Sequence, residues 1–145
     1  MDPKVISGNR VFDNRGSLIF NNNLKFNNIK RFYLVHNYSK NFIRAWHGHL
    51  KEEKYIKCLE GTFQVSAVKI DNIKKPKKNN KVYNYFLNES NHDFIHIPKG
   101  YANGSMSLEN NSKLIIFSTL SLEESIKDDY RFDARYWNPW KIDER

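Results

Sequence analysis

The sequence has few of the residues that cross-link or interrupt a chain. Its 145 residues include one cysteine, two methionines, four prolines and six glycines. The single cysteine, Cys58, excludes an intramolecular disulfide framework and a zinc site built from a cysteine cluster. We interpret Cys58 itself as a small buried apolar residue.

Long apolar runs are also missing. No stretch approaches the roughly 18 to 20 apolar residues of a membrane-spanning helix. The N-terminal segment MDPKVISGNRVF lacks the apolar region of a signal peptide. We therefore expect a cytoplasmic protein without membrane association, and the length predicts a single domain over residues 1–145.

Positive charge is in excess, with a formal net charge of +8. Five of the lysines fall within residues 74–81, KKPKKNNK, between two strand-like runs. A charged stretch with a proline and paired asparagines is typical of a solvated loop. We therefore expect no nucleic-acid partner, and at most a basic rim that attracts an anionic small molecule.

Strand-like patterns fill most of the chain. Apolar and aromatic residues alternate with polar ones in short segments about ten residues apart, which favours an all-β sandwich or barrel. The expected strands are 17–20, 30–37, 43–49, 54–59, 62–70, 82–87, 94–97, 103–108 and 113–119. Residues 122–130 read as the helical segment, with a capping box at Ser121 and Glu124. The aromatic tail 131–145 is expected to pack on the barrel or on a partner subunit.

Two histidines offer the clearest chemistry. His47 and His49 stand two residues apart on an expected strand, so their side chains lie on the same face, and Trp46 faces the opposite way. A lone histidine on a strand is usually structural, but two on one face followed by Lys54 favour a functional site. Glu52 and Glu53 read as loop charges.

Two stretches resemble the paired motifs of the cupin superfamily. His47, His49, Glu53 and Gly61 match the first motif, and Pro98 with Gly100 matches the second. In metal-binding cupins two histidines, the glutamate and a later histidine hold a divalent ion. Asn103 stands where that later histidine is expected, and an amide is a poor ligand for iron, nickel or zinc. We therefore expect no bound metal.

A more specific resemblance covers residues 11 to 140. Its matching positions are Asp13-x-Arg15-Gly16-Ser17, Ile29-Lys30-Arg31-x-Tyr33, Arg44-x-x-His47-x-His49, Lys54, Ile97-Pro98-x-Gly100-Tyr101-Ala-Asn103-Gly104 and Trp137-Asn138-Pro139. This order is similar to the dTDP-4-dehydrorhamnose 3,5-epimerases and the dTDP-4-keto-6-deoxyglucose 3,4-ketoisomerases. The resemblance implies an all-β, cupin-type jelly-roll barrel with one short C-terminal helix. It also implies a homodimer and a setting in polysaccharide biosynthesis.

The resemblance implies an isomerase without a cofactor, acting on a nucleotide-linked 4-keto-6-deoxy sugar. His47 aligns with the base that removes a proton next to the ketone, and Lys54 with a lysine beside that ketone. His49 and Tyr33 are the further catalytic candidates. Arg44, Arg15, Tyr101 and Asn103 are the candidates for substrate binding.

One departure affects the choice of reaction. The epimerases carry a tyrosine acid on the strand that is here 113–119, and the matching position reads as Phe117, which has no proton to give. His49, Tyr33 or Tyr101 would then supply the acid, or the enzyme would remove and return the proton on one face, as a ketoisomerase or an epimerase acting at one carbon. The sequence leans slightly to an epimerase over a ketoisomerase. It is also compatible with a metal-dependent cupin and with a non-catalytic sugar-binding cupin.

Overall fold

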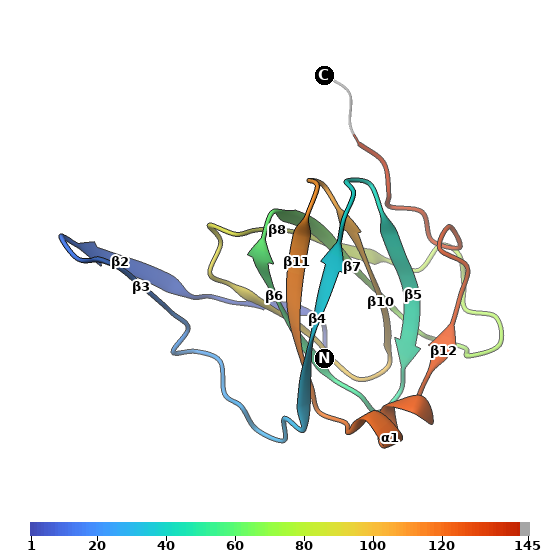
Figure 1. Cartoon of the computed structure of the whole chain (residues 1–145). Helices are drawn as coiled ribbons and strands as arrows, with labels where there is room; N and C mark the ends of the chain where they lie inside the picture. Colours follow the sequence, from blue (N-terminus) through green and yellow to red (C-terminus); the bar gives the residue numbers. More distant parts are fainter. Residues whose placement is uncertain (143–145) are drawn as a thin grey trace.

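The chain folds into two five-stranded antiparallel sheets that face each other, in a computed structural model that describes residues 1–142 (Figure 1). The first sheet has the order β1 (Lys4–Ile6), β9 (Phe94–Ile97), β6 (Lys54–Glu60), β11 (Ser112–Ser118) and β4 (Arg31–Asn37). The second has the order β12 (Tyr130–Arg131), β5 (Ile43–His49), β10 (Tyr101–Ser107), β7 (Thr62–Lys69) and β8 (Val82–Asn88). The predicted all-β jelly roll is confirmed.

The core between the sheets follows from the alternation along the strands. In β11, Leu114 and Ile116 point inward while Ile115 and Phe117 point outward, and β6 and β7 supply the facing apolar side chains. Eleven buried residues form this core: Ile56, Cys58, Phe63, Val65, Ala67, Leu87, Ile95, Ile97, Tyr101, Leu114 and Ile116. The interpretation of Cys58 as a buried apolar residue is confirmed.

A second apolar layer covers the outer face of the second sheet. Trp137 and Trp140 of the C-terminal tail pack against Trp46 of β5, with ring centroids 5.4 and 5.2 Å away. The Trp46 indole donates hydrogen bonds to the carbonyls of Ala134 and Trp137 at 3.1 and 3.0 Å. The tail therefore packs on the barrel as expected, and its residues 143–145 lie outside the described part of the chain.

The lysine-rich stretch 74–81 lies in the loop between β7 and β8, as predicted. Its lysine side chains are exposed, but Pro76 is buried. The indole of Trp137 donates to the Lys77 carbonyl at 3.0 Å, and the Tyr136 hydroxyl donates to the Pro76 carbonyl. The tail therefore fixes the backbone of this loop and leaves its charges in solvent.

The helix is shorter than expected. Helix α1 spans Leu122–Ile126, and the predicted capping box at Ser121 and Glu124 is confirmed. The prediction that it continues to residue 130 is wrong, because the chain turns after Lys127 and residues 130–131 pair with β5. No helix among the described residues combines the length and apolar character needed to span a bilayer.

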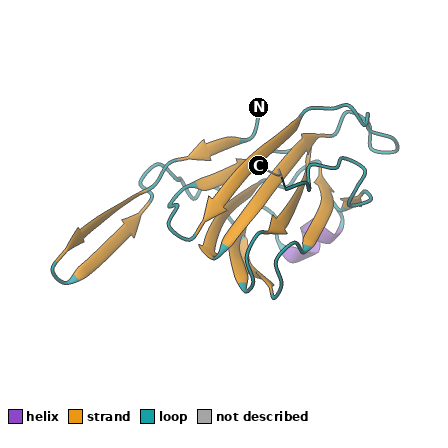
Figure 2. Cartoon of the chain, turned by 90° about the horizontal axis from the view of Figure 1, so that it is seen from above, coloured by secondary structure: helices purple, strands orange, loops and turns teal. Residues whose placement is uncertain are grey.

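The N-terminal part contains two strands that the sequence pattern did not predict, β1 and β2 (Asn9–Asp13). β1 pairs with β9, and β2 pairs with β3 (Gly16–Phe20), the expected strand 17–20, in a separate hairpin. This hairpin extends away from the barrel, and α1 lies at another part of the molecule (Figure 2). Its large apolar side chains Val11, Phe12, Leu18 and Ile19 are exposed.

Removing one tail anchor tests the second layer. Trp137→Ala is expected to lower the free energy of unfolding by about 3–5 kcal/mol, because it deletes a buried aromatic side chain and its hydrogen bond. Ile142→Ala, an exposed change in the same tail, is the control and should cost less than about 0.5 kcal/mol. Urea denaturation measures both, and equal effects would contradict the packing role of the tail.

Candidate active site

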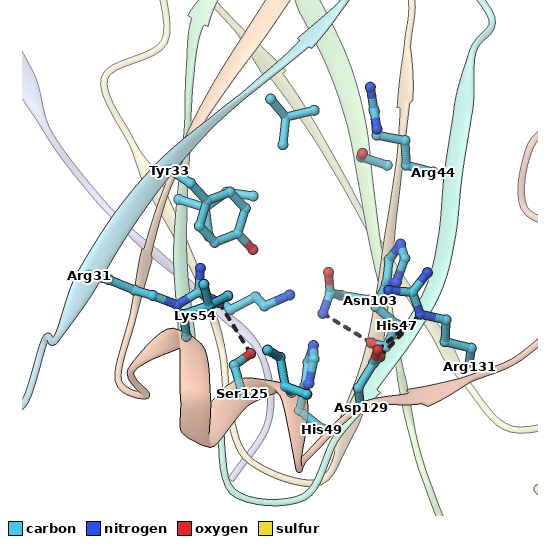
Figure 3. A pocket seen from close by; sticks show the side chains of 15 residues that line it. Arg31, Tyr33, Arg44, His47, His49, Lys54, Asn103, Ser125, Asp129 and Arg131 are labelled. Atoms are coloured by element: carbon cyan, nitrogen blue, oxygen red, sulfur yellow. Dashed lines mark hydrogen bonds and ion pairs between the residues drawn. The ribbon is translucent and has the colours of Figure 1, made fainter.

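A cavity of about 330 Å³ opens between the two sheets at the end covered by α1 (Figure 3). This volume lies within the usual range of small-molecule sites. Side chains from both sheets, from α1 and from the segment around β12 line it: Arg31, Tyr33, Val35, Arg44, His47, His49, Lys54, Asn103, Ser105, Ile116, Leu122, Ser125, Ile126, Asp129 and Arg131.

The second sheet supplies the histidines. Residues His47 and His49 of β5 face the cavity, while Trp46, the residue before His47, is buried under the tail, so the predicted division of faces is confirmed. Asn103 of β10 lies opposite His47 in the strand register, and its amide donates to the His47 carbonyl at 3.2 Å.

The first sheet supplies Lys54 and Tyr33 on the other side of the cavity (Figure 3). Burial lowers the pKa of Lys54 to about 8, although the nearby carboxylate of Glu52 acts in the opposite direction. Burial, helped by the charge of Glu52, raises the pKa of Tyr33 to about 12. At neutral pH, Lys54 is therefore mostly a cation and Tyr33 keeps its proton.

The ring of His49 is held by a backbone carbonyl. Its Nδ1 lies 2.7 Å from the carbonyl oxygen of Asp128. Because a carbonyl only accepts, Nδ1 carries the proton and the neutral ring keeps its lone pair on Nε2. That Nε2 is buried and has no hydrogen-bond partner among the described residues. His49 therefore has the tautomer of a general base.

His47 has a different environment. Burial lowers the pKa of His47 to about 4, and the charges of Lys54 and Arg131 contribute to the same direction. The carboxylate of Asp129 offsets part of this effect. His47 is therefore neutral at pH 7 and a weaker proton acceptor than an ordinary histidine.

The segment that leads into β12 contributes groups that the sequence motifs did not reveal. The carboxylate of Asp128 accepts hydrogen bonds from the backbone N–H groups of Leu50, Lys51 and Glu52, each at 2.9 Å. Asp129 and Arg131 line the cavity and pair with each other at 3.1 Å. In the sequence, the two adjacent acids Asp128 and Asp129 were the available sign of a functional group in this segment. The partners of Asp128 lie far away in the chain, so the local sequence did not identify them.

Glu52 corrects another expectation. The interpretation of Glu52 as a loop charge is wrong, because its side chain is buried beneath the cavity. It contacts the hydroxyls of Ser118 and Ser125, the guanidinium of Arg31 and the ring of His49.

Six of the eight predicted site residues meet in this cavity: Tyr33, Arg44, His47, His49, Lys54 and Asn103. Two lie elsewhere. Arg15 is exposed at the tip of the β2–β3 hairpin, where it pairs with Asp13 at 2.5 Å. Tyr101 is buried in the core, and its hydroxyl donates to Asp2 at 3.2 Å.

The expectation about Phe117 is also corrected. Phe117 lies on the outer face of β11, where its ring packs against Phe26 with centroids 5.1 Å apart. Its neighbour Ile116 faces the cavity instead and pairs with Tyr33 in the strand register. Adjacent residues of a strand face opposite sides, so Phe117 is not the residue of β11 that faces the cavity.

The donor set does not match the metal-binding motif of cupins. Glu53 contacts the ring of His96 at 2.8 Å and does not line the cavity with His47 and His49. No group of three or more histidine, cysteine, aspartate or glutamate side chains within residues 1–142 is arranged to hold a metal ion. The cavity instead carries four cations, Arg31, Arg44, Lys54 and Arg131, and one carboxylate, Asp129, which suits an anionic ligand.

The low proton affinity of His47 is directly measurable. In an NMR titration its ring should stay neutral from pH 8 to about pH 5, because its pKa lies near 4. Lys54→Met removes a neighbouring positive charge and should raise that pKa. A His47 ring that titrates at its ordinary value, or one that does not respond to Lys54→Met, would contradict the electrostatics described.

Comparison with known proteins gives a consistent picture. Residues 1–138 match the family model described as FdtA: WxcM-like, C-terminal. A curated TDP-4-oxo-6-deoxy-alpha-D-glucose-3,4-oxoisomerase from Aneurinibacillus thermoaerophilus is 37% identical over 68 residues, which make up 45% of this chain and 48% of that protein. The match thus spans about half the length of this relative.

Solved structures share the fold. The dTDP-4-dehydrorhamnose 3,5-epimerase of Bacillus anthracis, with TDP and PPi bound, has a TM-score of 0.75 at 18% identity, over 99% of this chain and 87% of that one. A variant of the 3,4-ketoisomerase QdtA of Thermoanaerobacterium thermosaccharolyticum, in complex with TDP-4-keto-6-deoxyglucose, has a TM-score of 0.71 at 19% identity, over 93% and 91%. The family match covers nearly the whole chain, and the protein therefore belongs to the FdtA family of WxcM-like, C-terminal proteins.

Proposed function

We propose that this protein is an isomerase that moves the ketone of a TDP-linked 4-keto-6-deoxy sugar from C4 to C3. The observation that carries this proposal is the Nε2 of His49, which has no hydrogen-bond partner within residues 1–142 and lies in a cavity that also holds Lys54. The name of the curated relative, a 3,4-oxoisomerase, supports the same reaction. The structural relatives include both ketoisomerases and epimerases.

The cations of the cavity fit the diphosphate of such a substrate. Arg44 lines the cavity, and a hydrogen bond from its Nε to the side-chain oxygen of Asn37 at 2.7 Å fixes its side chain. A planar guanidinium forms paired hydrogen bonds with phosphate oxygens. We assign Arg44 the diphosphate, with Arg31 and Arg131 as further cations of the same cavity.

The reaction needs a base, a cation and a route for one proton. The C–H bond at C3 is acidic because it lies next to the C4 ketone. His49 Nε2 takes this proton, and the electrons of the bond form an enediolate whose oxygen is stabilised by Lys54. The protonated His49 then returns this proton to C4, and the O3 proton moves to O4, which leaves the ketone at C3 and a hydroxyl at C4. Atoms and electrons balance without a redox partner.

Epimerisation is the second candidate, and the position of Tyr33 favours it. His47 and His49 belong to one sheet and Tyr33 to the other, so a sugar ring between them has a proton donor on each face (Figure 3). Inversion at C3 or C5 would need proton removal by His49 and return from Tyr33. Of the residues proposed to supply the acid, Tyr33 is the one on the far side of the cavity.

Proton and carbon NMR in deuterium oxide with dTDP-4-keto-6-deoxyglucose test the reaction. We expect loss of the C4 ketone resonance and appearance of a C3 ketone in the carbon spectrum. His49→Asn should slow this by roughly 10²- to 10⁴-fold, because it removes the base. Deuterium at C3 or C5 with the ketone still at C4 would instead identify an epimerase, and Tyr33→Phe would then abolish inversion.

A third outcome of this experiment is that the protein binds the sugar but does not change it. A spectrum without exchange, combined with line broadening of the TDP-sugar signals, would identify a sugar-binding protein and contradict both catalytic candidates.

We also propose a homodimer. The hairpin β2–β3 extends from the barrel with exposed apolar side chains, and the outer surface of β4 exposes Phe32 and Leu34. Such an apolar arm and sheet face favour burial against a second copy. Arg15, at the hairpin tip, then acts as a substrate ligand only if the hairpin reaches the cavity of the partner.

Light scattering tests the dimer. The wild-type protein is expected at twice the 17.3 kDa chain mass. Leu18→Asp places a charge on the apolar arm and should shift the mass to that of one chain, because a buried unpaired charge is costly. Lys25→Asp, an exposed change beside the arm, should leave the mass unchanged. A wild-type protein of 17.3 kDa would contradict the proposal.

A further inference from the structure

A buried carboxylate lies directly beneath the cavity. Glu52 is 2% exposed and belongs to the short connection between β5 and β6. One of its oxygens, Oε1, accepts from the hydroxyls of Ser118 and Ser125 and from the guanidinium of Arg31, which is 3.4 Å away. Three donors therefore hold this oxygen and fix the orientation of the carboxylate.

The second oxygen has a different environment. Oε2 of Glu52 lies 3.1 Å from Nδ1 of His49 and has no hydrogen-bond partner among the described residues. A buried carboxylate oxygen without a donor is costly. The cost falls when the neighbouring ring becomes positively charged, because an imidazolium beside a carboxylate is an ion pair.

We propose that Glu52 is a positioning residue that orients His49 and stabilises the imidazolium formed when His49 Nε2 takes a proton. The Asp128 carbonyl fixes the ring tautomer, and Glu52 supplies the opposing charge. A carboxylate behind the base nitrogen of a histidine acts in this way in hydrolase triads. The kinetic part of the proposal rests on the proposed function, but the effect of Glu52 on the ring does not.

The charge of Glu52 also acts on the far side of the cavity. Burial and the positive charge of Lys54 lower the pKa of His49, and Glu52 opposes this shift. Burial likewise lowers the pKa of Lys54, and Glu52 again opposes it. The other charged or titratable groups that act on these two residues are His47 on β5, Arg31 on β4, and Asp128, Asp129 and Arg131 at β12.

The adjacent residue provides a matched control. Glu53 also pairs with a buried histidine, His96, with 2.8 Å between carboxylate oxygen and Nε2. This second pair lies away from the cavity, where the His96 ring stacks on Tyr55 with centroids 4.7 Å apart. The chain thus holds two neighbouring carboxylate–imidazole pairs, of which one is at the cavity.

The test compares Glu52→Gln with Glu53→Gln. Both changes remove one negative charge and keep the shape of the side chain. Glu52→Gln is expected to lower kcat roughly 10- to 100-fold while KM changes less than about twofold, because the charge is needed once the proton has moved. Glu53→Gln should leave kcat within about twofold of wild type. Glu52→Asp, which keeps the charge, should recover part of the loss.

The pH profile gives a signature that a structural role would not produce. Without Glu52 the pKa of His49 and that of Lys54 both fall. The acid limb of kcat/KM, which requires neutral His49, then moves to lower pH. The alkaline limb, which requires protonated Lys54, also moves to lower pH. The whole bell-shaped curve is therefore expected to shift in the acid direction for Glu52→Gln and not for Glu53→Gln.

An NMR titration of the His49 ring separates this proposal from the proposed function, because it needs no substrate. Glu52→Gln should lower the His49 pKa, and Glu53→Gln should leave it unchanged. An unchanged His49 pKa in folded Glu52→Gln overturns the proposal, whatever the activity. So does an equal loss of kcat in both variants. If wild type does not turn over the sugar, the proposed function fails and the titration alone decides the role of Glu52.

Discussion

The cavity depends on the bonds that Asp128 makes to the connection between β5 and β6. Its carboxylate accepts three backbone N–H groups of this connection, and its carbonyl accepts the Nδ1 proton of His49. One residue thereby sets both the path of the loop and the tautomer of the ring. The loop in turn delivers Glu52 below the cavity and Lys54 into it. Without this link, neither sheet alone would hold the base and the cation at the same place.

The tail keeps this link in position. After Asp128 the chain pairs with β5, contributes Asp129 and Arg131 to the cavity, and then crosses the outer face of the second sheet to bury Trp137 and Trp140 around Trp46. Strand β5 is therefore packed on one face by aromatic rings and lined on the other by histidines. The rigid backing limits the movement of the histidines, as a proton transfer between fixed positions requires.

Much of the fold and part of the site follow from the sequence. The period of two along the strands predicts which side chains face inward, and it correctly separates His47 from Trp46. The limit of prediction from the sequence is shown by Arg15, Tyr101 and Phe117, which do not line the cavity. A resemblance gives a residue's position in the chain but not the direction of its side chain. Glu52 and Asp128 could not be predicted at all. Their partners lie 66 and 79 residues away in the chain, and a carboxylate in a loop usually faces solvent.

A crystal structure of the His49→Asn variant with dTDP-4-keto-6-deoxyglucose would test the proposed site most directly, because this variant should bind the sugar without converting it. We expect the diphosphate at Arg44 and C3 of the sugar within roughly 3.5 Å of the position of the missing Nε2. The C4 ketone oxygen should lie within hydrogen-bond distance of Lys54 Nζ. A sugar that binds in the cavity with C3 and the ketone directed away from these two groups would contradict the assignment of His49 as base and Lys54 as oxyanion partner.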